Sequence, residues 1–338
     1  VAAAPAMSRR CEELLALLAD GALHSGADLA ASLGVSRAAV WKRVGELRGL
    51  GVQVESLPRS GYRLPRPVEL LSAARIAGLL EQHGRRLGPR LEVLFEVGST
   101  NTYLHDASAP LPGQPRVVFA ELQHAGRGRR GRSWLAPFGS GLTFSVGWTF
   151  ADMPPGLPAL GLAVGVGLAR ALQSIGLADA RVKWPNDLVW QRRKLGGLLL
   201  QLRSEAGGPA SIVAGLGINV ALPKEARDSL IAPGAQPVAD LAEALGRRLP
   251  GRNELAATLA AAMLDTFDEF ARAGYAAFAP RWAALDALAG AQVRVAQADG
   301  DVEGEACGTG DDGALLVRVA GELRRFHSGD VSLRPVTP

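Results

Sequence analysis

Apolar residues in the first fifty positions recur with helical spacing. Residues 11–19 gather their leucines on one side of a helix. Ser25, followed by Asp28, is a capping-box pattern that starts a second helix, and Gly34 suits the left-handed turn that ends it. Ser36 caps a third helix. The buried face of that helix recurs at i, i+4 and i+7: Val40, Val44 and Leu47. Two helices joined by a short glycine-containing turn predict a helix-turn-helix unit.

The residues that follow have the period of a short hairpin. Residues 52–57 alternate between apolar and polar, residues 58–61 have turn chemistry, and residues 62–64 return as a second strand. This hairpin predicts a wing beside the three helices. Two prolines stiffen residues 65–67, so we expect a first domain to end there and to span residues 1–67.

The pattern changes again along the rest of the chain. Residues 68–282 alternate between strands and helices in an α/β or α+β manner. Predicted strands lie at 92–96, 117–122, 142–148, 198–202 and 212–216, and predicted helices at 161–175 and 253–273. Residues 291–334 hold short alternating runs broken at Asp299-Gly300, 308–313, Gly321 and Gly329, which predicts a small β-barrel. We assign this barrel to a last domain, residues 283–338.

Composition indicates an ordinary folded protein with a basic first module. The 338 residues are 48% hydrophobic and 21% charged, with a net charge of +4. Residues 1–67 hold nine basic and six acidic residues, as a small nucleic-acid domain would. Cys11, Cys307 and the histidines are scattered, so we expect no structural metal and a reduced, cytoplasmic protein. Residues 1–6 lack a signal-peptide pattern, and the apolar run 157–169 is too short to span a bilayer.

The third helix carries more cations than acids. Its charged side chains are Arg37, Lys42, Arg43 and Arg48 against Glu46. Since apolar residues take the buried positions, we expect the cations to project outward. A basic helix after a tight turn is typical of major-groove recognition, which predicts DNA contacts by Ser36, Arg37, Lys42 and Arg43. The alternative interpretation is a solvated face that serves protein contacts.

The densest chemistry is the Gly-Arg-Gly-Arg-Arg-Gly-Arg run at residues 126–132. Arginines interleaved with glycines do not form a stable strand or helix unaided, so we predict a mobile cationic loop at a strand end. Its backbone N–H groups and forked guanidinium donors suit an anion. No Gly-Lys-Ser/Thr follows, so it is not a P-loop. Taken alone, the run is equally typical of a disordered segment that contacts RNA or phosphate.

Four further motifs surround this loop in the sequence. Residues 98–101 (GSTN) stand at a predicted strand-to-helix junction, residues 183–187 read KWPND, residues 194–197 (KLGG) stand at a predicted turn, and residues 215–219 read GLGIN. Together with the basic loop and Trp134, in this order, they resemble a biotin protein ligase. With the winged module and the barrel, residues 11–336 resemble the bifunctional ligase and repressor of the biotin operon. The resemblance implies an α+β multidomain fold: a winged helix-turn-helix, a mixed-sheet ligase core with flanking helices, and an SH3-like barrel.

The resemblance also implies a reaction. Such ligases join biotin to ATP as biotinyl-5′-AMP and transfer it to a lysine of the biotin carboxyl carrier protein. We expect ATP with Mg²⁺, biotin as substrate and no tightly bound cofactor. The expected catalytic residues are Arg127, Arg129, Lys183 and Lys194. The expected binding residues are Ser99, Thr100, Asn101, Gln123, Gly126, Gly128, Trp134, Gly197 and Asn219, together with Arg127, Arg129 and Lys194.

Individual residues keep alternative interpretations. Asp187 is either linked to the metal ion or an ordinary turn residue. We interpret Trp134 and Trp184 as residues that anchor the core. The alternative for Trp134 is that it packs over adenine. We interpret Asn219 as shaping the pocket wall and Gly126, Gly128 and Gly131 as hinges.

The resemblance also implies that biotin regulates DNA binding. Biotinyl-5′-AMP would order the loop and favour a homodimer that binds the operator DNA of biotin-synthesis genes, with no membrane partner. The carrier protein would compete for the same surface. Three alternatives remain: a ligase whose first module no longer represses, a ligand-sensing transcription factor, and a lipoate-type acyltransferase.

Overall fold

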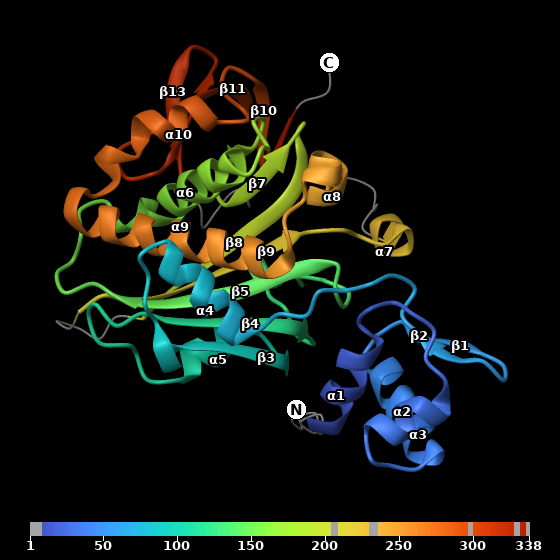
Figure 1. Cartoon of the computed structure of the whole chain (residues 1–338). Helices are drawn as coiled ribbons and strands as arrows, with labels where there is room; N and C mark the ends of the chain where they lie inside the picture. Colours follow the sequence, from blue (N-terminus) through green and yellow to red (C-terminus); the bar gives the residue numbers. More distant parts are fainter. Residues whose placement is uncertain (1–8, 204–208, 230–235, 297–299, 328–331, 336–338) are drawn as a thin grey trace.

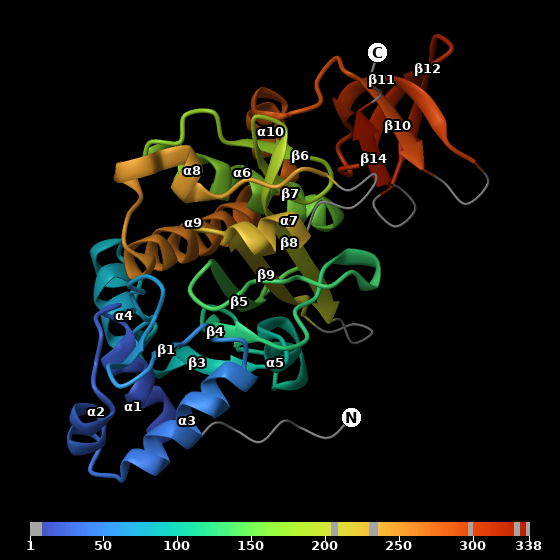
Figure 2. The same cartoon turned by 90° about the vertical axis from the view of Figure 1, so that its right-hand side faces the viewer.

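Three lobes follow one another along the chain in the computed structural model (Figure 1). The structure describes residues 9–203, 209–229, 236–296, 300–327 and 332–335. The expectation about residues 1–6 and the predicted turns at Asp299 and Gly329 lie outside these residues. An α-helical lobe with a hairpin comes first, a large sheet covered by helices comes second, and a small five-stranded sheet comes last (Figures 1 and 2).

The first lobe is the predicted winged helix-turn-helix. Its elements are α1 (Arg9–Leu18), α2 (Gly26–Ser32), α3 (Arg37–Gly49), β1 (Glu55–Leu57) and β2 (Gly61–Arg63). Both predicted caps are confirmed: the Asp28 N–H donates to Ser25 Oγ at 3.1 Å, and the Ala39 N–H donates to Ser36 Oγ at 3.2 Å. Each cap satisfies a backbone donor that the first helical turn leaves open.

The wing is shorter than predicted because its first residues serve the core. Val52 and Val54 are buried among the helices and do not pair with β2. The hairpin is tied back to the loop before α2, since His24 and Tyr62 exchange backbone hydrogen bonds of 3.0 and 2.9 Å. A Cβ on Gly61 would overlap the His24 carbonyl group, so this close approach requires glycine.

The central lobe is a seven-stranded mixed sheet in the order β3-β4-β5-β9-β8-β7-β6. Its strands are β3 (Leu91–Val97), β4 (Arg116–Gln123), β5 (Gly141–Thr149), β6 (Arg181–Lys183), β7 (Asp187–Trp190), β8 (Arg193–Arg203) and β9 (Ser211–Asn219). Only β3 and β4 run parallel, because α5 crosses between them; the other pairs are antiparallel. The mixed sheet is therefore confirmed.

Helices cover the sheet unequally. On one face lie α4 (Ala73–Gln82), α6 (Leu160–Ser174), α9 (Arg252–Ala273) and α10 (Ala279–Leu285), and on the other lies α5 (Thr100–Asp106) (Figure 1). The connection after β9 holds α7 (Lys224–Ser229) and α8 (Leu241–Leu245). The segment Leu157–Ser174 has the length and composition of a membrane span. Here most of its side chains are buried against the sheet and α9, as in a core helix.

The last lobe is an antiparallel, SH3-like sheet in the order β13-β12-β11-β10-β14. Its strands are β10 (Gln292–Ala296), β11 (Val302–Thr309), β12 (Leu315–Val319), β13 (Glu322–Phe326) and β14 (Ser332–Pro335). Its core is continuous with the central core. Trp184 is 1% exposed, and its indole N–H donates to the Gly313 carbonyl at 2.9 Å. The interpretation of Trp184 as a core anchor is confirmed, and it joins the two lobes.

Candidate functional site

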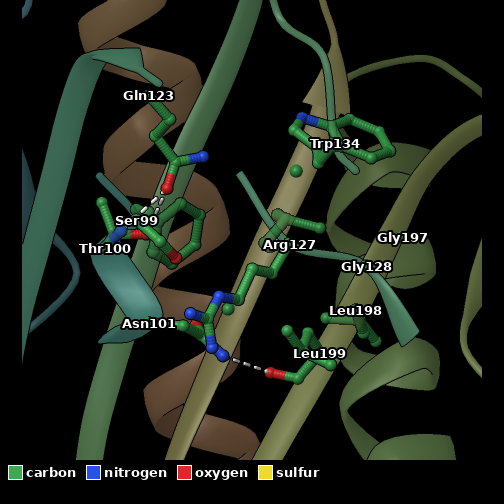
Figure 3. Close-up of a pocket in the computed structure, with 14 residues that line it drawn as sticks. Ser99, Thr100, Asn101, Gln123, Arg127, Gly128, Trp134, Gly197, Leu198 and Leu199 are labelled. Atoms are coloured by element: carbon green, nitrogen blue, oxygen red, sulfur yellow. Dashed lines mark hydrogen bonds between the residues drawn. The ribbon is translucent and has the colours of Figure 1, made fainter. Parts of the chain in front are cut away.

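A pocket opens on the face of the sheet that carries α5 (Figure 3). The turn between β3 and α5, the end of β4, the strands β8 and β9 and the basic loop all contribute to it. Residues that we predicted to bind ligand and that line it are Ser99, Thr100, Asn101, Gln123, Arg127, Gly128, Trp134 and Gly197. Residues separated by up to about a hundred positions therefore meet at one site.

Glycines on β9 form the floor of this pocket. Gly215 and Gly217 alternate along the strand, so both face the same side of the sheet. A Cβ on Gly215 would lie 2.8 Å from Asn101 Cγ, and a Cβ on Gly217 would lie 2.6 Å from the indole nitrogen of Trp134. Both distances are shorter than real Cβ contacts. Because these two glycines have no side chains, Asn101 of α5 and Trp134 of the loop can pack directly against the backbone of β9.

A polar network fixes the α5 end of the pocket. The Thr100 N–H donates to Gln123 Oε1 at 2.8 Å, which ties the start of α5 to the end of β4. The Asn101 amide donates to the Leu199 carbonyl at 3.0 Å, and Ser145 Oγ donates to Asn101 Oδ1 at 2.6 Å. These side chains are held in place before any ligand arrives, which is the preorganisation that a binding site needs.

One member of the site was missed at the sequence level: Ser145 on β5, which is fully buried and supports Asn101. Ser99, which was predicted, also caps α5 through the Thr102 N–H. The signal for Ser145 was the period of two, since the polar residues of this strand, Thr143, Ser145 and Thr149, are separated by even numbers of positions. A polar residue on the buried face of a central strand indicates a site.

The basic loop is closed on itself. The Trp134 N–H donates to the Gly126 carbonyl at 2.8 Å, and the Gly128 N–H donates to the Arg132 carbonyl at 2.6 Å. One 3₁₀ turn, Arg129–Gly131, is the only helical or strand element within the run, which agrees with the prediction of an irregular loop. Its Arg130 adopts a left-handed conformation with φ 56°.

Side chains of this loop lie over the pocket. Figure 3 shows Arg127 across the centre of the site, between Asn101 and Leu199, and Trp134 at its upper rim. The cavity that remains is about 40 Å³, far below the roughly 300–1,000 Å³ of ligand pockets. The Trp134 indole nitrogen is buried and lacks a hydrogen-bond partner within the described part of the chain. A ligand that displaces Arg127 therefore gains both space and a free donor.

A second charged cluster adjoins the pocket. Lys194 Nζ lies 2.6 Å from Asp187 Oδ1 and would lie 3.3 Å from a Cβ on the pocket residue Gly197. Arg129 reaches Asn186 Oδ1 at 3.5 Å. Burial lowers the pKa of Arg129, the neighbouring cation Arg130 lowers it further, and the carboxylate of Asp187 opposes both. Arg129 remains a cation, and an added anion would stabilise it.

Other predicted residues hold the surroundings of the site. Lys183 Nζ donates to Gln236 Oε1 at 2.7 Å and does not line the pocket. The buried Asn219 amide donates to the Ala239 carbonyl at 3.0 Å, as a residue that shapes the wall would. The expectation that Lys194 stands at a turn is wrong, because Lys194 is the second residue of β8. The turn is formed by the two residues before that strand, which have positive φ angles.

The outer face of α3 carries part of the predicted DNA contacts. Arg37 and Lys42 are exposed. The expectation that Arg43 projects outward is wrong: it is 7% exposed, and one of its terminal nitrogens has no partner among the described residues. Its position completes the buried stripe at i, i+3, i+4 and i+7. Arg48 donates to the Val54 carbonyl at 2.9 Å and thereby holds the wing.

Comparisons with known proteins agree with this architecture. Residues 95–219 match the Biotin/lipoate A/B protein ligase family, residues 10–63 match an HTH domain, and residues 289–334 match the Biotin protein ligase C terminal domain. The Bifunctional ligase/repressor BirA of Escherichia coli (strain K12) is 38% identical over 322 residues, which cover 95% of this chain and 96% of the relative. The chain belongs to the biotin protein ligase family.

The chain is also similar to members of the family at lower sequence identity. The Bifunctional ligase/repressor BirA of Bacillus subtilis (strain 168) is 27% identical and spans 91% of this chain and 93% of the relative. The Biotin--[acetyl-CoA-carboxylase] ligase of Mycobacterium tuberculosis is 33% identical and spans 72% and 88%. A solved biotin protein ligase from Aquifex aeolicus, in complex with biotin and ATP, is 26% identical with a TM-score of 0.61, and covers 73% of this chain and 99% of that one. The family resemblance inferred from the motifs is confirmed.

Proposed function

We propose that this protein activates biotin with ATP to biotinyl-5′-AMP and transfers it to a lysine of the biotin carboxyl carrier protein. We also propose that its first domain binds operator DNA and represses biotin-synthesis genes. The observation that carries the ligase proposal is the pocket: fixed polar groups at one end, a glycine floor and a crowded guanidinium cluster at its mouth. Family members named as biotin ligases and repressors support both parts.

The chemistry requires cations where this structure concentrates them. In the first step a biotin carboxylate oxygen bonds to the α-phosphorus of ATP, and pyrophosphate leaves. In the second step a lysine amine bonds to the acyl carbon, AMP leaves and the amine loses a proton. Both partners of the first step are anions, so their Coulomb repulsion opposes the approach. Cations held beside the reacting atoms offset this repulsion and stabilise the charge that develops.

Residue roles follow from position. We assign Ser99, Thr100, Asn101 and Gln123 to the polar groups of biotin, because they form the fixed end of the pocket. Trp134 and the glycines Gly126, Gly128 and Gly197 form the walls and mouth. Arg127, Arg129 and Lys194 face the carboxylate and phosphates, whereas Lys183 must first leave Gln236, and Asn219 shapes the wall.

Mg²⁺ enters this proposal on the nucleotide. Asp187 acts on Arg129, but it is paired with Lys194, and no group of three acidic, histidine or cysteine ligands gathers among the described residues. These residues do not form a metal site by themselves. We assign Asp187 to positioning Lys194.

One reaction tests the ligase. The parent protein, biotin, MgATP and a carrier domain are mixed, and mass spectrometry detects biotin on the carrier lysine. Arg129→Ala and Lys194→Ala should each lower the transfer rate at least a hundredfold, about 2.7 kcal/mol of lost transition-state stabilisation. Arg272→Ala, which removes an exposed arginine at the end of α9, should transfer at the parental rate. A folded parent that binds biotin but forms no adenylate contradicts the ligase proposal.

The repressor part needs a separate test. We propose that biotinyl-5′-AMP favours a homodimer of this cytoplasmic protein, with domains at residues 1–67, 68–282 and 283–338, and that the dimer binds the operator. The stiff joint at residues 65–67 and the three lobes of Figure 1 support these boundaries. Sedimentation and DNA binding are measured with and without biotin and MgATP. Equal sedimentation and equal DNA affinity in both conditions would remove the regulatory part and leave the ligase.

A further inference from the structure

Trp41 is an exposed aromatic residue on α3, the helix that we propose lies in the major groove of operator DNA. Its side chain is 70% exposed, the most of any large hydrophobic residue in the part of the chain that the structure describes. A single exposed apolar residue needs no explanation by itself. The position of this one does, because it lies on α3 next to the cations Arg37 and Lys42.

The geometry of α3 separates Trp41 from the core. The buried stripe consists of Val40, Arg43, Val44 and Leu47. Trp41 is one residue beyond this stripe, and a helical side chain leans over the turn that precedes it, so the indole extends toward Arg37 and Ala38. Figure 1 shows α3 at the outer side of the first lobe, away from the sheet.

Two neighbours of Trp41 on the outer face are small, and a third, Arg37 at i−4, is a cation. Ala38 precedes it by three residues and Gly45 follows by four, the spacing of side chains that meet on one face. A Cβ on Gly45 would have no neighbour within 4 Å, so no contact inside the lobe requires glycine there. Glycine in a helix interior costs about 1 kcal/mol relative to alanine. Because Ala38 and Gly45 have little or no side chain, a partner can approach the indole closely from their sides.

We propose that Trp41 reads thymine in the operator by packing its indole on the thymine 5-methyl group in the major groove. This inference rests on the proposed DNA binding. Thymine is the one base that presents an apolar group at the major-groove edge. The second helix of a helix-turn-helix lies in that groove, and the flanking cations Arg37 and Lys42 provide the attraction to phosphate. The excess of cations on α3 favours a polyanion over a protein as the partner of this face.

The experiment first obtains a DNA target and then removes single methyl groups. The full-length parent, with biotin and MgATP, selects duplexes from a random library. In the selected duplex each thymine is replaced in turn by uracil, which lacks only the methyl group. At one or more positions the replacement should weaken parental binding about fourfold, the worth of one buried methyl group. Trp41→Ala should bind the thymine and uracil duplexes equally.

Matched variants distinguish recognition of the thymine methyl group from electrostatic attraction to the DNA phosphates. Lys42→Ala should weaken all duplexes, lower the salt dependence by about one charge and keep the parental ratio between thymine and uracil duplexes. Trp41→Phe, which keeps an aromatic surface, should keep most of that ratio. Because Trp41 is exposed, both Trp41 variants should unfold at the parental temperature and transfer biotin at the parental rate.

Two results overturn the inference in distinguishable ways. A Trp41→Ala protein that keeps the parental ratio at every thymine, or that loses affinity equally for all duplexes, shows that Trp41 does not read the methyl group, while DNA binding stands. A parent that enriches no duplex overturns the DNA-binding proposal together with this inference. In that case biotin transfer by the same preparation still decides the ligase proposal independently.

Discussion

Replacing Gly215 by alanine tests the central feature of the pocket, its glycine floor. The added Cβ would overlap Asn101, with its Cγ at 2.8 Å, and would lie 3.2 Å from Ser145 Oγ. The Asn101 side chain cannot move away without breaking hydrogen bonds, because its amide donates to the Leu199 carbonyl and its oxygen accepts from Ser145. The substitution must therefore either move β9 or break this hydrogen-bond network.

The magnitude follows from these two costs. Overpacking a tight contact costs about 1–3 kcal/mol, and leaving a buried amide unsatisfied costs about 1–3 kcal/mol more. We expect Gly215→Ala to lower the free energy of unfolding by about 3 kcal/mol, a large part of the 5–15 kcal/mol typical of a domain. Displacing Asn101 should also raise the dissociation constant of biotin at least tenfold, which corresponds to about 1.4 kcal/mol.

Urea denaturation and calorimetric biotin titration measure both effects. The matched control is Gly78→Ala in α4, where a Cβ would have no neighbour within 4 Å and alanine favours the helix by up to about 1 kcal/mol. If Gly215→Ala has parental stability and parental biotin affinity, Asn101 is not fixed against the floor and the reasoning is wrong. A loss of stability with unchanged biotin affinity would refute only the assignment of the pocket.

Three further changes probe the scaffold. Gly167→Ala would place a methyl group against Thr266 where α6 crosses α9, and we expect it to lower the unfolding free energy by about 1–3 kcal/mol, with recovery in the Gly167→Ala/Thr266→Ala double variant. Arg252→Met removes the cation that lies 2.8 Å from the buried Glu121 carboxylate, so thermal and urea unfolding should show a loss of about 3–5 kcal/mol. Adding Glu121→Leu should restore only part of this loss, because the Leu71 N–H then loses its acceptor. Burial raises the pKa of Asp286 to about 6 from 3.8, so the folded protein holds this proton more tightly than the unfolded chain and loses stability as pH rises from about 4 to 6. Asp286→Asn should therefore raise the unfolding free energy by about 1–3 kcal/mol at pH 7 and leave it unchanged at pH 3; an equal gain at both values would contradict the titration.

Features set by neighbouring residues could be predicted from the sequence. The caps at Ser25 and Ser36 depend on a side chain and an amide three residues apart, so their chemistry is visible locally. The helix at α9 and the strands at β4 and β9 follow from periodicity in the same way. Gly197, which we predicted to bind ligand, does line the pocket.

Features set by register and by packing between distant elements could not be predicted. Arg43 has the sequence signature of a surface cation, and its burial depends on how α1 and α2 cover α3. Ser145 meets Asn101 only because β5 pairs with β9, which aligns Ser145 with Gly215. Likewise, Lys194 and Lys183 read as equals in the motifs, but strand pairing directs one toward the pocket and the other toward Gln236.

The closed loop explains why substrate charge matters for opening the pocket. Arg127 fills the site. Burial and the neighbouring cation Arg130 lower the pKa of Arg129, whereas the carboxylate of Asp187 raises it. A carboxylate or phosphate at this mouth would add negative charge beside Arg129 at the same moment as it displaces Arg127. Opening the loop costs free energy. The attraction between the ligand anion and the arginines offsets this cost, and the attraction is stronger in a partly desolvated site than in water. We therefore expect the arginine-rich loop to favour anionic ligands, and this is the property that a reaction between two anions requires.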